Sequence, residues 1–187
     1  MSTIEIKNLT KRYGEAEVLS NINMKLESGK IYGLVGRNGS GKTMLMKHIL
    51  GFVKATQGTI LINGKAVGEN DDMQENIGAI IENPGFLPEY SGFTNLKLLA
   101  MFHAKIKDAQ IKDAIRLVGL DPESKKAVGK YSLGMRQRLG LAQALMENPD
   151  ILLLDEPLSG LDNDGVQEMW KLFLQHKEDG KLIVLAS

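Results

Sequence analysis

The stretch "LVGRNGSGKT", residues 34–43, limits the possible folds of this 187-residue chain more than any other feature of the sequence. It matches the pattern G-x-x-x-x-G-K-[ST] without departure. Before it, "IYGLV" predicts a buried strand, and after it, "KTMLMKHIL" predicts a helix that ends at Gly51. The alternative, a glycine-rich turn followed by a chance Lys-Thr, leaves the strand-loop-helix setting unexplained. The sequence therefore predicts a loop that binds the phosphates of a nucleoside triphosphate.

The residues of this loop have distinct chemical tasks. Glycine lacks a Cβ, so successive backbone N–H groups can converge on phosphate oxygens, and the positive end of the following helix adds to the attraction. Lys42 is expected to reach the β- and γ-phosphates of ATP, and the Thr43 hydroxyl can bind Mg²⁺. The residues of this stretch predicted to bind the nucleotide are Gly36, Arg37, Asn38, Gly39, Ser40, Gly41, Lys42, Thr43 and Met44.

The composition excludes several classes of function. Lys+Arg and Asp+Glu both number 23, so no excess of positive charge indicates a nucleic-acid partner. The chain has no cysteine, which excludes disulfides and thiolate metal sites, and its three histidines are scattered. The N-terminus lacks the apolar segment of a signal peptide, and no apolar run is long enough to span a bilayer. The length and the 43% hydrophobic content indicate a single domain, residues 1–187.

A second predicted strand carries two carboxylates. "PDILLLDEP" predicts an apolar strand that ends in Asp155 and Glu156, and the carboxyl ends of strands face the ligand crevice in parallel α/β sheets. We expect Asp155 to hold Mg²⁺ through its water shell and Glu156 to polarise the attacking water. Taken alone, two acidic residues here are usually a solvated strand end. Beside a complete phosphate loop they are interpreted as the catalytic pair, and Lys42 is counted as catalytic with Glu156.

The segment "YSLGMRQRLGLAQAL", residues 131–145, predicts a helix for which Ser132 is a favourable N-cap. On its own, it is an amphipathic helix packed on the core. The segment also resembles the signature of ATP-binding cassette (ABC) proteins, and it lies where they carry it, shortly before "LLLDEP". The resemblance implies that Ser132, Gly134 and the helix N-terminus bind the γ-phosphate of ATP held by a second ATP-binding subunit. Leu133 and Met135 depart from the usual Gly and Gln.

The resemblance covers essentially the whole chain. "SGLD", directly after "DEP", resembles the D-loop of the family, which implies that Asp162 bridges the two subunits near the nucleotide. Tyr13 in "KRYG" occupies the place of the aromatic residue that stacks on adenine. Without the resemblance, a lone tyrosine at a strand edge is more often a packing residue.

One position departs from the family pattern. After "IGAII" the family normally has a Gln that binds Mg²⁺, and here Glu82 stands in its place. A carboxylate can still bind the metal, but it adds negative charge beside Glu156 and the triphosphate. A solvent-facing loop residue is the alternative. Glu82 and the following "NPGFLPEYSGFTNL" resemble a subgroup of bacterial ABC transporters that export, or confer immunity to, peptides such as bacitracin and lantibiotics.

A helical subdomain is expected at about residues 83–148, where "TNLKLLAMFHAK" and "DAQIKDAIRLVGL" are amphipathic at helical spacing. In the family this surface meets the membrane subunit, whereas periodicity alone indicates only helices on a core. No heptad run is present, unlike the coiled coils of chromosome and DNA-repair ABC ATPases. The resemblance implies an α/β fold: a P-loop NTPase of ABC type, with a mainly parallel core sheet flanked by helices, an N-terminal antiparallel β patch and a helical insert.

The resemblance also implies a function. We expect the ATP-binding and ATP-hydrolysing subunit of an ABC transporter, which energises export of a drug or antimicrobial peptide through a separate membrane subunit. Its cofactors are ATP and Mg²⁺, its second partner is another ATP-binding subunit, no nucleic acid is expected, and it lies on the cytoplasmic side of the membrane. Two alternatives stay open: a soluble ABC ATPase acting on ribosomes or DNA, and a nucleotide-binding module without turnover.

The last predicted strand, "GKLIVLAS", is apolar throughout most of its length and is expected to lie centrally in the sheet. In the family, a histidine that contacts the γ-phosphate follows this strand. His176 precedes the strand, so it cannot take that place. The sequence is therefore expected to be an N-terminal piece of a longer subunit, with weak ATPase activity.

Overall fold

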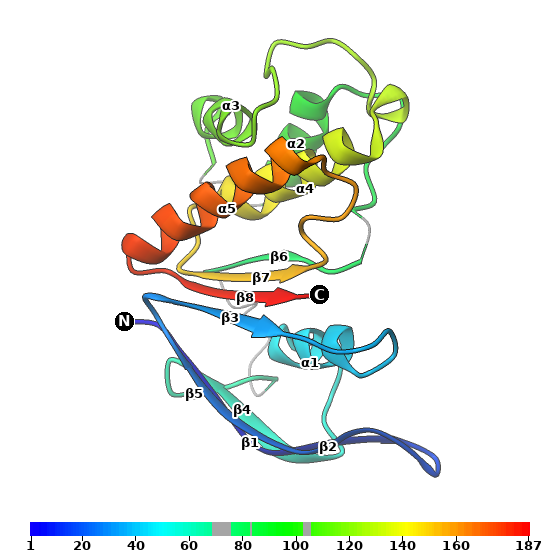
Figure 1. Cartoon of the computed structure of the whole chain (residues 1–187), viewed down its shortest axis with the longest axis vertical. Coiled ribbons are helices and arrows are strands. Elements are labelled where there is room, and N and C mark those ends of the chain that lie inside the picture. Colours follow the sequence, from blue (N-terminus) through cyan, green and yellow to red (C-terminus); the bar gives the residue numbers. More distant parts are fainter. Residues whose placement is uncertain (69–75, 83, 103–105) are drawn as a thin grey trace.

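The computed structural model describes residues 1–68, 76–82, 84–102 and 106–187. Within them, an antiparallel sheet and a parallel sheet are stacked with one helix between them, and the other four helices lie on the outer side of the parallel sheet (Figure 1). The first residue of the predicted insert, Asn83, and residues 103–105 of its first predicted helix lie outside the described part. No helix of the described part has the length and apolarity to cross a membrane.

The antiparallel sheet is the patch predicted near the N-terminus. Its strand order is β2-β1-β4-β5. The predicted Asn-Gly turn between β4 and β5 is present, and both Asn63 and Gly64 have positive φ, 52° and 80°. Such a backbone suits a two-residue hairpin loop, because its twist matches that of the flanking strands. The strands are β1 (Thr3–Tyr13), β2 (Ala16–Glu27), β4 (Gln57–Ile62) and β5 (Lys65–Ala66).

The parallel sheet has the order β3-β8-β7-β6, so β8 lies inside the sheet, as its apolar sequence predicts. Successive side chains of a strand point to opposite faces. Leu152 and Leu154 of β7 therefore face one core, and Ile151 and Leu153 face another. Burial on both faces explains why β7 and β8 are apolar without alternation, whereas the edge strand β3, which the sequence predicts to be buried, is only partly buried. The strands are β3 (Lys30–Leu34), β6 (Ile77–Ile80), β7 (Ile151–Asp155) and β8 (Leu182–Ala186).

Two hydrophobic cores hold the layers together. The inner core joins the antiparallel sheet, the helix α1 and one face of the parallel sheet. The outer core joins the other face to the remaining helices, which lie above the sheet in Figure 1. The helices are α1 (Lys42–Ile49), α2 (Gly92–Ala100), α3 (Asp108–Leu117), α4 (Leu133–Leu145) and α5 (Asn163–Glu178), with a 3₁₀ turn at Val128–Lys130.

The register of the parallel sheet brings the ends of its four strands to one edge. Leu34 of β3 pairs with Ala186 of β8, and Ala186 pairs with Asp155 of β7. Ile80, the last residue of β6, pairs with Leu154. The glycine loop after β3 and the acidic residues after β6 and β7 therefore leave the sheet at the same level, which is where α/β sheets bind ligands.

Gly78 of β6 provides a test of the packing between the parallel sheet and α4. A Cβ added at Gly78 would overlap the carbonyl oxygen of Ala144 and lie 2.7 Å from Pro149 Cγ. Because the obstacle is largely backbone, we expect Gly78→Ala to destabilise the fold by about 3 kcal/mol. The measurement is the free energy of unfolding in urea.

Gly85 is the matched control, because a Cβ there would meet nothing within 4 Å. We expect Gly85→Ala to change the free energy of unfolding by less than about 0.5 kcal/mol. Equal effects of the two substitutions would contradict the described approach of β6 to α4.

Candidate functional site

The loop between β3 and α1 is shaped by its glycines. Gly41 is the N-cap of α1 with φ of 93°, and no side chain caps the helix there. A Cβ on Gly41 would lie 2.8 Å from Leu19 Cδ2 and 3.0 Å from Val18 O, so only glycine fits both the backbone and the space. The first N–H groups of α1 are therefore left without a capping side chain, at the positive end of a helix, where anions bind favourably.

Lys42 lies across the same loop. Its ammonium donates hydrogen bonds to the carbonyl oxygens of Gly36, at 2.6 Å, and Arg37, at 3.4 Å. A Cβ on Gly36 would come within 2.5 Å of Ser40 Oγ, so the loop closes tightly at this point. The loop thus holds a positive charge among backbone N–H groups, the arrangement that a polyphosphate needs.

Thr43 and Asp155 are in direct contact, although 112 residues separate them in the chain. The Thr43 hydroxyl donates a 2.5 Å hydrogen bond to Asp155 Oδ2, and Asp155 is only 7% exposed. A hydroxyl and a carboxylate supply the hard oxygen ligands that Mg²⁺ prefers, and Mg²⁺ commonly completes its shell with phosphates and water. These two residues fit the predicted metal site.

Glu156 follows Asp155 in a left-handed backbone conformation, with φ of 47°. Its N–H donates to Ala186 O at 3.0 Å, and its own carbonyl oxygen accepts a 3.0 Å hydrogen bond from Gln137 Nε2. Gln137 is 8% exposed and comes from α4. The sequence analysis missed Gln137; the only signal was a polar residue on the buried side of a predicted amphipathic helix.

Glu82 also has a left-handed backbone, with φ of 61°, two residues beyond β6. Its Oε1 lies 2.6 Å from Nζ of Lys47, four residues after Thr43 in α1. The structure therefore pairs Glu82 with a cation rather than leaving it to solvent alone. The sequence analysis missed Lys47 as well, and its position on the same face of α1 as Thr43 is the signal that could have revealed it.

These residues surround one cavity of about 650 Å³ at the carboxyl edge of the parallel sheet. Most of the predicted site residues reach it: residues 38–44, Glu82, Asp155 and Glu156 line it. Gly36 and Arg37 do not line it, but their carbonyl groups hold Lys42, which does. The other lining residues are Val18, Lys47, Leu133, Gln137 and Ser159.

Tyr13 lies beside this cavity rather than in its lining. Its hydroxyl is 4.0 Å from the sulfur of Met44, which lines the cavity, and the ammonium of Lys11 lies 4.6 Å from the centre of its ring. The ring is 52% exposed. An exposed aromatic ring next to the mouth of the cavity is compatible with stacking on a base, and this role stays a prediction.

Ser132, Gly134 and Asp162 lie outside the cavity lining. Ser132 is the predicted N-cap of α4 and accepts a 3.2 Å hydrogen bond from Met135 N, while Asp162 caps α5 by accepting from Gly165 N at 2.9 Å. A Cβ on Gly134 would lie 2.9 Å from Gly160 O, so the first turn of α4 touches the loop that precedes α5. Both capping residues are exposed, which leaves them accessible to another molecule.

His176 lies at the end of the parallel sheet opposite to the candidate site, and it precedes β8, as the sequence shows. It lies in the last turn of α5, which leads into the amino end of β8, whereas the site lies at the carboxyl end of the strands. Burial, assisted by the neighbouring Lys181 cation, lowers the pKa of His176 below its usual value. His176 is thus a half-buried residue of the opposite edge of the sheet.

The chain resembles known proteins over nearly its whole length. Residues 19–159 match the family described as ABC transporter. An uncharacterized ABC transporter ATP-binding protein of Bacillus subtilis, YybJ, is 45% identical over 98% of this chain and 84% of its own length. The bacitracin transport ATP-binding protein BcrA of Enterococcus faecalis is 43% identical over 98% of this chain, which spans 60% of BcrA.

The fold also matches a solved structure, the dimeric bacterial ABC transporter cassette MJ0796. Its TM-score is 0.89 at 26% identity, over 98% of this chain and 87% of the cassette. The expected fold class is therefore confirmed. Together with the matched family and the relatives above 40% identity, this likeness shows that the chain belongs to the ABC transporter family.

Proposed function

We propose that the chain binds and hydrolyses ATP to energise export of a drug or antimicrobial peptide through a separate membrane subunit. The observation that carries the ATPase assignment is the hydrogen bond between Thr43 and Asp155, which joins the phosphate loop to the acidic strand end in one cavity. Similarity to the bacitracin transport protein supports export of a peptide antibiotic. Together they favour a transporter subunit over a module without turnover.

The residues of the cavity have separate tasks in this reaction. The loop N–H groups and Lys42 bind the β- and γ-phosphates, and Tyr13 stacks on the adenine at the mouth. Thr43, Asp155 and Glu82 would hold Mg²⁺, which would neutralise charge on the phosphates. Glu156 orients and polarises the water that attacks the γ-phosphate. The backbone of Glu156 is held on both sides, by Ala186 and Gln137, so its carboxylate starts from a fixed position.

A second ATP-binding subunit completes the site. Ser132 and Asp162 are exposed, and Gly134 in the first turn of α4 contacts the loop that precedes Asp162, so another chain can present its nucleotide to these residues. The N-terminus of α4 has no acidic residue in its first turn, so its positive end is free to attract a phosphate. The similar cassette MJ0796 is dimeric. We assign to these residues the γ-phosphate of ATP bound by the partner.

The membrane subunit docks on a groove of about 300 Å³ between α2 and the loop after β6. Pro84, two residues after Glu82, is one of the lining residues, and the apolar side chains of Leu87, Leu98 and Leu99 line the groove while remaining 36–47% exposed. Buried Asn95 fixes the loop by bonding both the N–H and the carbonyl oxygen of Leu87. Docking here places the chain on the cytoplasmic face of the membrane.

Two substitutions separate binding from hydrolysis. Lys42→Ala removes the cation of the phosphate loop and should abolish measurable ATP binding, as calorimetry can determine. Glu156→Gln keeps the loop and the metal ligands, so it should bind ATP while its hydrolysis rate falls about a hundredfold. Lys25→Ala, on an exposed ion pair of β2, is the control that should alter neither. Unaltered ATP affinity in Lys42→Ala would refute the site.

Gln137→Leu tests whether the hydrogen bond from Gln137 to the backbone of Glu156 matters for hydrolysis. The substitution keeps the approximate size of the side chain but replaces its amide with an apolar group, which removes the hydrogen bond to the Glu156 carbonyl. We expect the turnover number to fall about tenfold, the cost typical of a displaced catalytic group, while ATP affinity stays within about twofold. Steady-state phosphate release gives the turnover number, and calorimetry gives the ATP affinity. The exposed Gln175→Leu on α5 is the matched control, and equal turnover of the two variants would remove Gln137 from the mechanism.

The groove can be tested in cells that make the whole transporter. Leu98→Glu places a charge on its apolar lining, so the tagged subunit should move from the membrane fraction to the supernatant. ATP binding by the purified variant should not change. Leu174→Glu introduces the same charge at a residue of α5 that is 46% exposed and should leave the subunit with the membrane. Membrane association of both variants would place the docking surface elsewhere.

A further inference from the structure

Two lysines, Lys42 and Lys47, are among the described residues that line the cavity. The ammonium of Lys47 forms an ion pair with the carboxylate of Glu82. Nζ of Lys47 and Oε1 of Glu82 lie 2.6 Å apart, a short distance for a charge-assisted hydrogen bond. Lys47 comes from α1, and Glu82 follows β6, so the pair ties the phosphate-loop helix to the far strand of the parallel sheet. No role in the proposed reaction has yet been given to Lys47.

Fold stability does not account for this pair. The Glu82 side chain is 65% exposed and that of Lys47 is 28% exposed. Solvent screens ion pairs that are this accessible, and they contribute little to folding. Glu82 also sits in a left-handed backbone conformation that non-glycine residues seldom adopt and that carries a conformational cost. A costly backbone and a weakly stabilising ion pair, both at the mouth of the cavity, point to a role in the site.

The charges in the cavity indicate what that role is. Its described lining has three carboxylates, Glu82, Asp155 and Glu156, against the two lysines. Asp155 accepts a hydrogen bond from Thr43, and Lys42 is held by loop carbonyl groups. Without a partner, Glu82 could turn toward the N–H groups and the Lys42 ammonium that are meant for phosphate, and would repel the phosphates themselves.

We propose that Lys47 is a positioning residue for Glu82: it holds this carboxylate on the side of α1 that carries Thr43, where it can serve as the proposed metal ligand, and away from the N–H groups and the Lys42 ammonium of the phosphate loop. Lys47 lies about one helical turn beyond Thr43 in α1. Its ion pair therefore holds the Glu82 carboxylate beside the helix rather than inside the phosphate loop. This inference rests on the proposed binding of ATP in the cavity. It assigns to Lys47 an effect that operates through Glu82 and not through contact with a phosphate.

The test is a double-mutant cycle on ATP affinity, measured by calorimetry with EDTA so that no turnover occurs. Lys47→Met retains the helix-compatible stem and removes the charge. It should weaken ATP binding about tenfold, because Glu82 is released toward the phosphates. In the Glu82→Gln background the same substitution should change affinity by less than about twofold, since no carboxylate remains to be positioned. Lys47→Arg, which can still pair, should retain most of the affinity.

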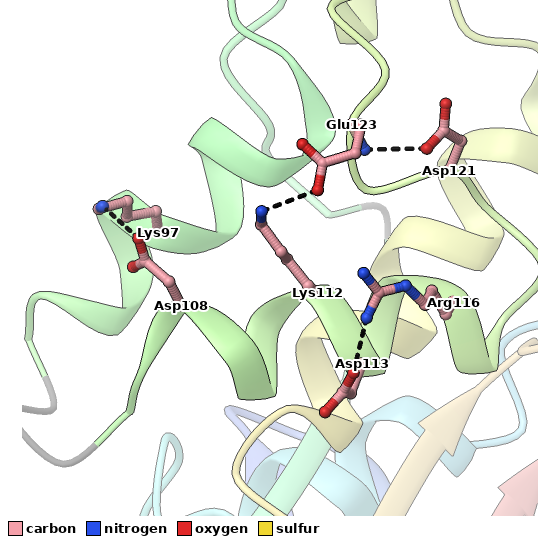
Figure 2. A network of polar contacts seen from close by, with 7 residues as sticks. All are labelled: Lys97, Asp108, Lys112, Asp113, Arg116, Asp121 and Glu123. Carbon is pink, nitrogen blue, oxygen red and sulfur yellow. Dashed lines mark hydrogen bonds and ion pairs between the residues drawn. The ribbon is translucent and has the colours of Figure 1, made fainter.

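An ion pair outside the cavity supplies the matched control. Figure 2 shows Lys97 of α2 joined to Asp108 of α3, at 2.8 Å and with side chains 49% and 56% exposed. The cycle of Lys97→Met and Asp108→Asn repeats the chemistry of the first cycle away from the nucleotide. All of its members should bind ATP as the unaltered chain does. Thermal unfolding of every variant should differ little, which separates positioning from a general effect on folding.

The outcomes are distinct. A tenfold loss with Lys47→Met that persists in the Glu82→Gln background would show that Lys47 contacts phosphate itself, and would overturn the inference. Unchanged affinity in Lys47→Met would also overturn it, while leaving ATP binding at the site intact. Absence of ATP binding by the unaltered chain, with EDTA and with Mg²⁺, would instead refute the proposed function on which the inference rests.

Discussion

Parallel pairing of β3, β8 and β7 is the constraint on which the rest of the structure depends. The glycine loop and the acidic strand end are separated by 112 residues, and nothing local in the chain brings them together. The register does so, because Leu34, Ala186 and Asp155 lie in one row across the sheet. Two cores, one on each face, fix this register, since a shift by one residue would exchange the buried faces of β7 and β8.

Charge in the site is arranged along the same edge. Each acidic residue there has a specific partner: Asp155 binds the hydroxyl of Thr43, Glu82 binds Lys47, and the backbone of Glu156 is held by Gln137. Lys42 is bound by carbonyl groups of its own loop. A site organised in this way before a ligand arrives loses less free energy in rearrangement when charge develops during phosphoryl transfer.

The sequence predicts the parts of this site that depend on local geometry. The glycine loop, the Ser132 cap and the acidic residues after β7 follow from residue types at fixed spacing, and the structure places them as expected. Central placement of β8 follows from its apolar character. In each case, the residues of one short segment determine its local structure, so the segment can be predicted without knowing which distant parts of the chain pack against it.

Contacts between distant segments are what the sequence does not predict. Gln137 and Lys47 enter the cavity because of how α4 and α1 are rotated on the sheet, and the packing of whole layers sets that rotation. Gly78 is a further example. Only glycine fits there because a Cβ would overlap the backbone of Ala144, and no local sequence pattern reveals that contact. The stacking role of Tyr13 and the partner-directed role of Ser132 remain predictions, because they concern molecules beyond this chain.

The short helical path from Ser132 to Gln137 has a consequence for assemblies of this protein. Gln137 lies five positions beyond the N-cap Ser132, a rise of about 7.5 Å along the helix. Ser132 lies on the exposed surface, and Gln137 donates a hydrogen bond to the backbone carbonyl of Glu156 at the cavity. A displacement of the exposed end by a neighbouring chain would act on Glu156 through a single helix. In a pair of such chains, α4 would be the direct connection between the exposed N-cap and the cavity.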